Sequence, residues 1–121
     1  MVKIQKSKHI NYEVSAENKS IGRLASEIAS MLTGKRDPSY LPNVIPQVSV
    51  LIKNFDKIKI TDKKMDGMVK YHYSGYPGGM KQKNWRTIFE NDPKKLLFSV
   101  LYNMIPKNKL RKDIIKKVKF V

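Results

Sequence analysis

The sequence contains no cysteine and only two histidines, His9 and His72. Without cysteine the chain can form neither a disulfide nor a thiolate metal site. Two histidines so far apart do not supply the clustered ligands of a zinc site. The sequence therefore predicts no metal site and no cofactor.

Long apolar runs are also missing. No stretch of about 18 apolar residues occurs, so no segment is expected to span a membrane. The N-terminus is basic but lacks the apolar block of a signal peptide and the Arg- and Ser-rich character of a transit peptide. We interpret residues 1–11 as a basic arm of one domain that covers residues 1–121.

Acidic residues are scarce. Ten acidic residues stand against 25 basic ones, which gives a formal net charge of +15. Abundant lysine is typical of AT-rich genomes, but that bias exchanges arginine for lysine and removes no acids. Self-repulsion at this charge destabilises a compact fold, so a polyanionic partner is expected.

Catalytic and nucleotide-binding motifs are absent from the sequence. Ser74 lies two residues from His72, but no nucleophile elbow surrounds it. The glycines match neither a phosphate-binding loop nor a dinucleotide fingerprint, and the acids form no convincing pair for acid–base chemistry. The sequence therefore predicts no catalytic residue, no enzyme activity and no small-molecule substrate.

The clearest element is an amphipathic helix that begins after Ser20 and ends at Gly34. Its apolar residues recur at helical spacing on one face, and glycine is the usual C-terminal cap. These residues are Ile21, Leu24, Ala25, Ile28, Ala29 and Leu32.

Strands and helices are expected to follow one another along the rest of the chain. Strands are predicted at 12–14, 48–52, 57–61 and 68–73, with 48–52 covered on both faces and a turn at 62–67. Helices are predicted at 84–90 and from Pro93, capped by Asp92, to a stop before Pro106. This order favours an α/β sandwich.

The stretch from Tyr71 to Lys81 is the main candidate for binding. Flat aromatic side chains can stack on exposed bases, and glycine lets a backbone approach closely. Composition alone equally allows an ordinary surface turn with half-packed tyrosines. The candidate RNA-binding residues here are Lys70, His72, Tyr73, Ser74, Gly75, Tyr76, Pro77, Gly78, Gly79, Lys81 and Lys83.

Two further basic segments are candidates for phosphate contact. After the first helix come Lys35, Arg36 and Tyr40, although the two cations could equally serve to offset the helix dipole. The segment 106–121 has one acid, Asp113, among many lysines, and its apolar residues recur at helical spacing. The candidates in this segment are Lys107, Lys109, Arg111 and Lys112.

Three blocks of the sequence resemble the ribosomal protein L13 family in its bacterial and organellar branch. They are Gly22–Ser26 with the residues that follow it to Pro42, Ser74–Gly79, and Met104–Arg111. The resemblance runs from about Tyr12 to the end of the basic segment. Ser15 and residues 45–48 depart from the family pattern.

This resemblance implies both a fold and a role. The fold is a three-layer α/β/α sandwich around a small, largely parallel sheet, with basic N- and C-terminal extensions. The role is structural, in the large ribosomal subunit, with large-subunit rRNA and neighbouring ribosomal proteins as partners and entry early in assembly. No membrane partner is expected, and the location is a ribosome in a bacterial cytoplasm or an organelle matrix.

Overall fold

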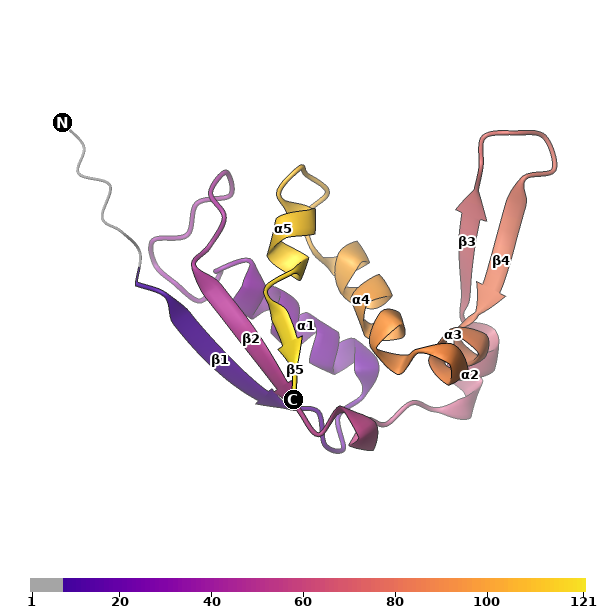
Figure 1. Ribbon diagram of the computed structural model, residues 1–121, viewed down its shortest axis with the longest axis horizontal. Helices are drawn as coiled ribbons and strands as arrows, with labels where there is room; N and C mark the ends of the chain where they lie inside the picture. The colour runs from indigo at the N-terminus through magenta and orange to yellow at the C-terminus, as the bar shows by residue number, and fades with distance from the viewer. Residues whose placement is uncertain (1–7) are drawn as a thin grey trace.

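The computed structural model describes residues 8–121, and its body is a three-stranded sheet in the order β1–β2–β5 (Figure 1). The strands are β1 (Ile10–Ser15), β2 (Val48–Lys53) and β5 (Val118–Phe120), and both pairs are parallel. The first seven residues of the expected N-terminal arm lie outside the described part. The last two residues of that arm belong to β1.

Helix α1 (Ile21–Leu32) connects β1 to β2 and covers one face of the sheet. Tyr12 pairs with Val50 and Val14 with Ile52, so apolar side chains of both strands share that face. The α/β class and the small, largely parallel sheet are confirmed. Gly34 follows α1 with a φ of 73°, as a C-terminal glycine should.

Strand β2 is more deeply buried on one face than on the other, which differs from the expected cover on both faces. Its residues alternate between buried and half-buried along its whole length. Asn11 and Glu13 on the neighbouring strand, on the less buried face, are exposed. The reason is that α1 and α4 bury their apolar residues in a single core with Val48, Val50 and Ile52.

Helix α4 (Pro93–Met104) forms as predicted. The Asp92 side chain accepts hydrogen bonds from the backbone N–H groups of Lys94 and Lys95, at 3.1 and 3.3 Å. Proline occupies the first helical position, where its missing N–H costs nothing. The helix ends before Pro106, and its Leu96, Leu97 and Leu101 are fully buried. Ser20 precedes α1 as expected, but its side chain makes no capping bond.

Two predictions between β2 and the hairpin are wrong. Residues 57–61 form no strand; a short 3₁₀ helix, η1 (Phe55–Lys57), is followed by a single bridge between Ser20 and Lys59. That bridge lies just before α1, so no neighbouring strand continues the ladder. The expected turn at 62–67 is a helix, α2 (Asp62–Gly67), because Met65 is buried and anchors it.

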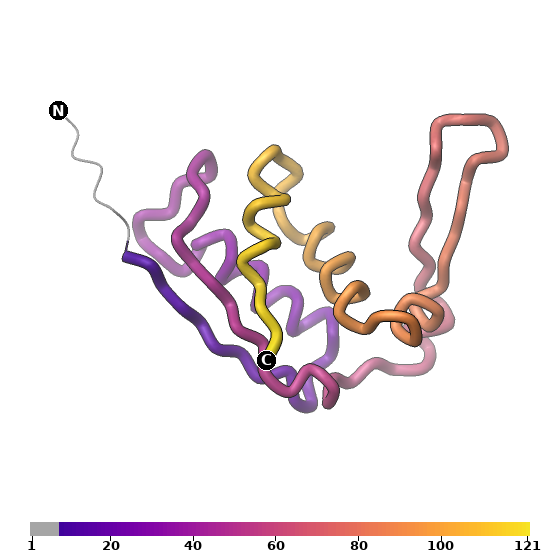
Figure 2. The backbone as a smooth tube through the Cα atoms, viewed as in Figure 1, coloured from indigo at the N-terminus to yellow at the C-terminus, as the bar shows by residue number. Residues whose placement is uncertain are grey.

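A β-hairpin projects from the body on the far side of α4 (Figures 1 and 2). It consists of β3 (Val69–Tyr73) and β4 (Met80–Asn84), which pair antiparallel, and α3 (Trp85–Asn91) follows directly. β3 and α3 agree with the prediction. β4 was not predicted, because Met-Lys-Gln-Lys-Asn has no apolar alternation and all five residues are exposed.

The basic C-terminal segment ends inside the sheet. After a short helix, α5 (Arg111–Ile115), it forms β5, where Val118 pairs with Val50. The Phe120 ring lies 5.2 Å from that of Phe55 and 5.5 Å from that of Phe98. The spacing of Ile114 and Val118 suggested one helix; both are buried, but Val118 is buried in a strand.

Candidate nucleic-acid interface

The hairpin has two chemically different faces. Lys70 pairs directly with Lys83, and His72 with Lys81, so these four side chains share one face. Tyr71 and Tyr73 alternate with them and point to the opposite face, together with Met80. The sequence pattern predicted a strand at 68–73 but not its partner β4, and so did not separate the two faces.

The cationic face lines a hollow of about 370 Å³ against α3 and α4. We call it the hairpin groove. Four of the predicted residues meet here, joined by side chains that were not predicted. The groove residues are Lys70, His72, Lys81, Lys83, Thr87, Ile88, Asn91, Lys95 and Ser99.

The tip of the hairpin is a hydrogen-bonded turn from Tyr76 to Gly79. The Gly79 N–H donates to the Tyr76 carbonyl at 2.9 Å, with Pro77 and Gly78 at the two central positions. Gly78 has a φ of 72°, which a proline–glycine turn of this type requires. The turn leaves the Tyr76 side chain 76% exposed, so this ring is not packed beneath the surface.

An ion pair joins the two helices at the base of the hairpin. Arg86 of α3 donates from Nε to Asp66 Oδ1 at 2.6 Å and from Nη2 to Asp66 Oδ2 at 3.1 Å. These hydrogen bonds lower the pKa of Asp66 and raise that of Arg86. The pair ties α2 to α3 and so fixes both ends of the hairpin.

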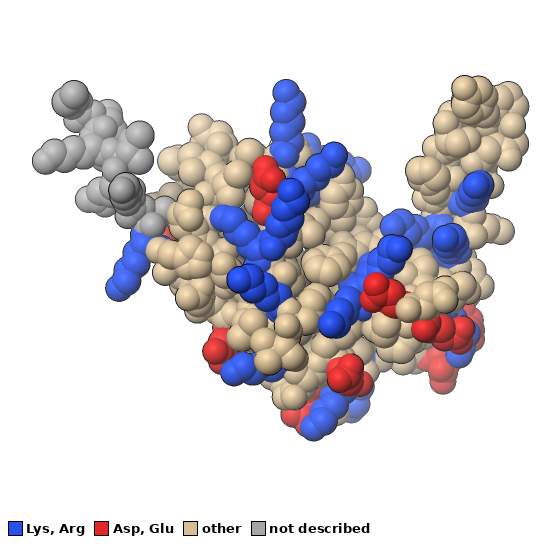
Figure 3. Space-filling model, viewed as in Figure 1, with Lys and Arg blue, Asp and Glu red and all other residues tan. Residues whose placement is uncertain are grey.

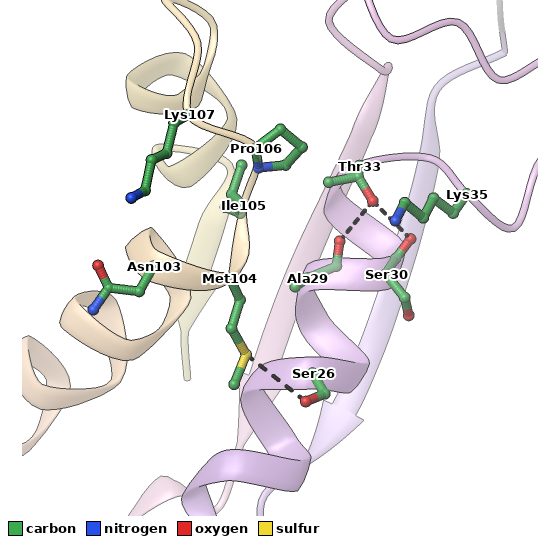
Figure 4. Close-up of a pocket in the computed structure, with 10 residues that line it drawn as sticks. All are labelled: Ser26, Ala29, Ser30, Thr33, Lys35, Asn103, Met104, Ile105, Pro106 and Lys107. Atoms are coloured by element: carbon green, nitrogen blue, oxygen red, sulfur yellow. Dashed lines mark hydrogen bonds between the residues drawn. The ribbon is translucent and has the colours of Figure 1, made fainter.

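A second hollow brings two predicted basic segments together (Figure 4). It has a volume of about 550 Å³ and lies between the C-terminal half of α1 and the end of α4; we call it the α1–α4 pocket. Lys35, from the loop after α1, and Lys107, from the basic C-terminal segment, both line it. The other lining residues are Ser26, Ala29, Ser30, Thr33, Asn103, Met104, Ile105 and Pro106.

Hydroxyl groups on α1 give this pocket a polar wall. Thr33 Oγ1 donates to the Ala29 carbonyl at 2.9 Å, and Ser26 Oγ lies 3.7 Å from the Met104 sulfur (Figure 4). Ser30 Oγ donates to the Glu27 carbonyl at 2.8 Å. The pocket thus combines apolar surface, hydroxyls and two lysines.

The rest of the loop after α1 is partly held by its own contacts. Arg36 is exposed and Tyr40 is half-buried beside Gly34. The Ser39 backbone N–H and hydroxyl both donate to Asp37, which lowers the pKa of that carboxyl group. Lys117 donates to the Pro46 carbonyl and so connects the loop to the end of α5.

Arg111 differs from the other candidates of the C-terminal segment. Lys107, Lys109 and Lys112 are exposed, whereas the Arg111 guanidinium lies 3.4 Å from the centre of the Tyr102 ring. Its Nη1 donates to the Tyr102 carbonyl at 3.2 Å, and its Nε is buried. Arg111 therefore joins α5 to α4 as well as adding charge.

The two hollows lie near opposite ends of α4 and adjoin a third one between them. That hollow shares Lys70, Lys95 and Ser99 with the hairpin groove and Asn103 with the α1–α4 pocket. Helix α4 has 12 residues and is therefore roughly 18 Å long. Five stacked nucleotides, at ~3.4 Å each, cover about the same distance.

Acidic and basic side chains lie side by side over much of the face shown in Figure 3. Ion pairs of Lys53 with Glu13 and of Lys57 with Glu17 place acids near the C-terminal ends of β1 and β2. Within residues 8–121, by contrast, no carboxylate forms an ion pair with a lysine of the hairpin groove. Since those lysines are not neutralised, the groove has the electrostatics of an anion site.

The sequence contained a signal for the missed groove residues. Thr87, Asn91, Lys95 and Ser99 recur at intervals of four, which places polar side chains along one line of consecutive helices. The helix break at Asp92 and Pro93 hid this regularity.

Among residues 8–121 no cluster of acids and histidines could hold a metal ion, and no helix is long and apolar enough to cross a membrane.

Comparison with known proteins gives consistent matches. Residues 9–121 match the family model described as ribosomal protein L13. A large ribosomal subunit protein uL13 of Pseudothermotoga lettingae is 42% identical over 108 residues, which are 89% of this chain and 74% of that protein. The protein of that name from Thermotoga maritima is 39% identical over 119 residues, 98% of this chain and 80% of the relative.

Proposed function

Because the chain belongs to the ribosomal protein L13 family, we propose that it binds large-subunit rRNA along the surface that connects the hairpin groove to the α1–α4 pocket. It is a protein of the large ribosomal subunit, and the family consists of structural ribosomal proteins rather than enzymes. The proposal concerns how this member contacts RNA.

The cationic hairpin face is the observation that carries the proposal. Lys70 lies opposite Lys83, and like charges across a strand pair are destabilising. His72 and Lys81 form the next exposed pair on the same face, so Lys81 has no acidic partner across the strands. Phosphate oxygens in the groove would convert this repulsion into attraction. Lys95 supplies a further cation from α4.

The α1–α4 pocket supplies the second contact in this proposal. Lys35 and Lys107 would hold backbone phosphates at its rim, and Arg36, Lys109 and Lys112 would extend the basic surface around it. A strand that occupies both hollows crosses α4. Contacts at two separated points would fix the orientation of the protein on its RNA.

We also infer early entry into the assembling subunit, with neighbouring ribosomal proteins docking later. Support comes from the net charge of +15, because a cationic protein allows rRNA segments to approach each other. The bacterial relatives favour a bacterial cytoplasm over an organelle matrix as the location. Mass spectrometry of pulse-labelled assembly intermediates tests the order of entry.

The central test is a salt titration of binding to a transcript of the large-subunit rRNA. If six to ten phosphates are neutralised, affinity should fall by on the order of a thousandfold or more between 50 and 200 mM salt. An affinity that scarcely changes over this range would contradict phosphate-dominated binding. A small-subunit rRNA transcript serves as the control for non-specific association.

A further inference from the structure

We propose that the two faces of the β3–β4 hairpin read different parts of the same RNA: the inner, cationic face holds phosphates, and the outer, aromatic face stacks on unpaired bases. This inference rests on the proposed function and goes beyond it, since it assigns a single-stranded RNA segment to a surface outside the groove.

The outer face is formed by Tyr71, Tyr73 and Met80, which are 63%, 57% and 58% exposed. Tyr73 pairs with Met80 across the strands, and Tyr71 pairs with Gln82. Within residues 8–121 neither of the two tyrosine hydroxyls makes a hydrogen bond to protein. With more than half of their surface exposed, both tyrosines are available to a partner.

The inner face lies back-to-back with the outer one. Lys70, Lys81 and Lys83 line the groove, and side chains of alternate residues point to opposite faces of a strand. On the face shown in Figure 3, basic side chains, with some acids beside them, lie at the base of the hairpin next to the body, whereas most of the visible projecting part carries no charged side chain. One thin ribbon thus separates a cationic surface from an aromatic one.

The chemistry of the outer face favours bases over a protein partner. Flat rings stack on any base, and the Gln82 amide offers both a donor and an acceptor for a base edge. Tyr71 and Tyr73 are two residues apart on one strand, roughly 7 Å, so each ring can serve a separate base. One segment of the RNA would present phosphates to the inner face, and a second, unpaired segment would present bases to the outer face.

The two faces make different predictions for salt dependence. Removing a phosphate contact lowers the slope of log affinity against log salt by about one. Removing a stack weakens binding at every salt concentration and leaves that slope unchanged. The paired variants Lys70→Gln/Lys83→Gln and Tyr71→Leu/Tyr73→Leu separate these effects, with the large-subunit rRNA transcript as the probe.

The lysine pair should lower the slope by about two, whereas the leucine pair should weaken binding at least about tenfold at unchanged slope. Tyr71→Phe/Tyr73→Phe keeps the rings and should bind like the wild type. Lys53→Gln/Lys57→Gln, which removes the same charge near the C-terminal end of β2, is the matched control and should change binding least. Melting temperatures verify that each variant is folded.

Wild-type affinity in the leucine pair would overturn the inference while leaving the proposed function intact. If that variant bound rRNA normally but entered subunits poorly, the outer face would dock a protein, which also overturns it. An equal loss of slope in the lysine pair and the leucine pair would show that the two faces do not act separately. A wild-type protein that fails to bind the transcript would instead contradict the proposed function.

Discussion

Two adjacent glycines shape the tip of the hairpin for different physical reasons. Gly78 adopts a positive φ, and a Cβ placed there would meet nothing within 4 Å, so only backbone strain opposes a side chain. At Gly79 a Cβ would lie 2.0 Å from the Ser74 hydroxyl and 2.9 Å from the Tyr76 carbonyl. The turn that presents Tyr76 therefore requires glycine at position 78 because of its positive φ, and at position 79 because a side chain would collide with its neighbours.

Tyr76 should matter for binding and not for stability. Its side chain is 76% exposed, so Tyr76→Ala removes little packing. One base–aromatic stack is worth roughly 1–3 kcal/mol, which corresponds to an affinity for the rRNA transcript about five- to a hundredfold weaker. Filter binding and thermal denaturation should be measured on the same preparation. A lower melting temperature with normal binding would make Tyr76 a packing residue.

Arg111 should behave differently from the lysines around it. Arg111→Lys loses the stacking on Tyr102 and the bond to its carbonyl, so the free energy of unfolding should fall by about 1 kcal/mol. Lys109→Gln, the matched control on an exposed neighbour, should leave stability unchanged and weaken RNA binding. Chemical denaturation of both variants checks this; equal stabilities would show that the Arg111 contact contributes nothing.

At the scale of elements, the position of the hairpin depends on the joint between α2 and α3. Met65 of α2 is buried, α2 packs against α3, and Arg86 connects α3 to Asp66 by two hydrogen bonds. The Trp85 N–H donates to the Met68 carbonyl at 3.0 Å and closes the base of the hairpin. These contacts hold the cationic face toward α4, so the groove depends on residues outside it.

The Asp66–Arg86 pair predicts a pH dependence of stability. Hydrogen bonds from Arg86 lower the folded-state pKa of Asp66 below its ordinary value of 3.8. Its contribution is therefore complete above that value and disappears as the pH falls through the folded-state pKa. Asp66→Asn should melt at a lower temperature than the wild type at pH 7, and the difference should shrink from about pH 5 to about pH 3. A pH-independent difference would contradict this origin.

At the scale of the whole molecule, unneutralised charge dominates. Acids form ion pairs near one end of the sheet, with Arg86 and with Lys116. Within residues 8–121, none pairs with a lysine of the hairpin groove or with the two lysines of the α1–α4 pocket. Without RNA this excess opposes the compact state. Binding of a polyanion stabilises the folded protein by mass action, because it binds the native form.

The free protein should therefore melt at a higher temperature as salt is added. Ions screen repulsion between exposed charges, with a Debye length of about 10 Å at 0.1 M. Sulfate should raise the melting temperature more than chloride at equal ionic strength, because a multivalent anion can also occupy the basic hollows. Scanning calorimetry in the two salts measures the effect; a melting temperature that is independent of both would show that repulsion is unimportant.

Local patterns were sufficient for much of the fold. The apolar stripe of α1, the Asp92–Pro93 start of α4 and the run at β2 each specify their element through short-range geometry. Composition alone predicted a polyanionic partner, since the charge excess of +15 is visible without coordinates. The chemistry of Tyr71–Lys81 predicted an exposed stretch, and the structure confirms that Tyr71, Tyr73 and Tyr76 are exposed; its contact with RNA stays a prediction.

Contacts between residues far apart in the chain decided those features of the fold that short-range sequence patterns do not encode. β5 becomes a strand because Val118 and Phe120 meet β2 and two distant phenylalanines, although the spacing of the segment suited a helix. The pairing of β3 with a polar β4 sorted the lysines from the tyrosines, because the register decides which side chains share a face. Lys35 and Lys107 line one pocket because α1 packs against α4, a contact between residues far apart in the chain. The sequence thus determined which chemical groups the chain carries, whereas long-range packing determined which of those groups lie together.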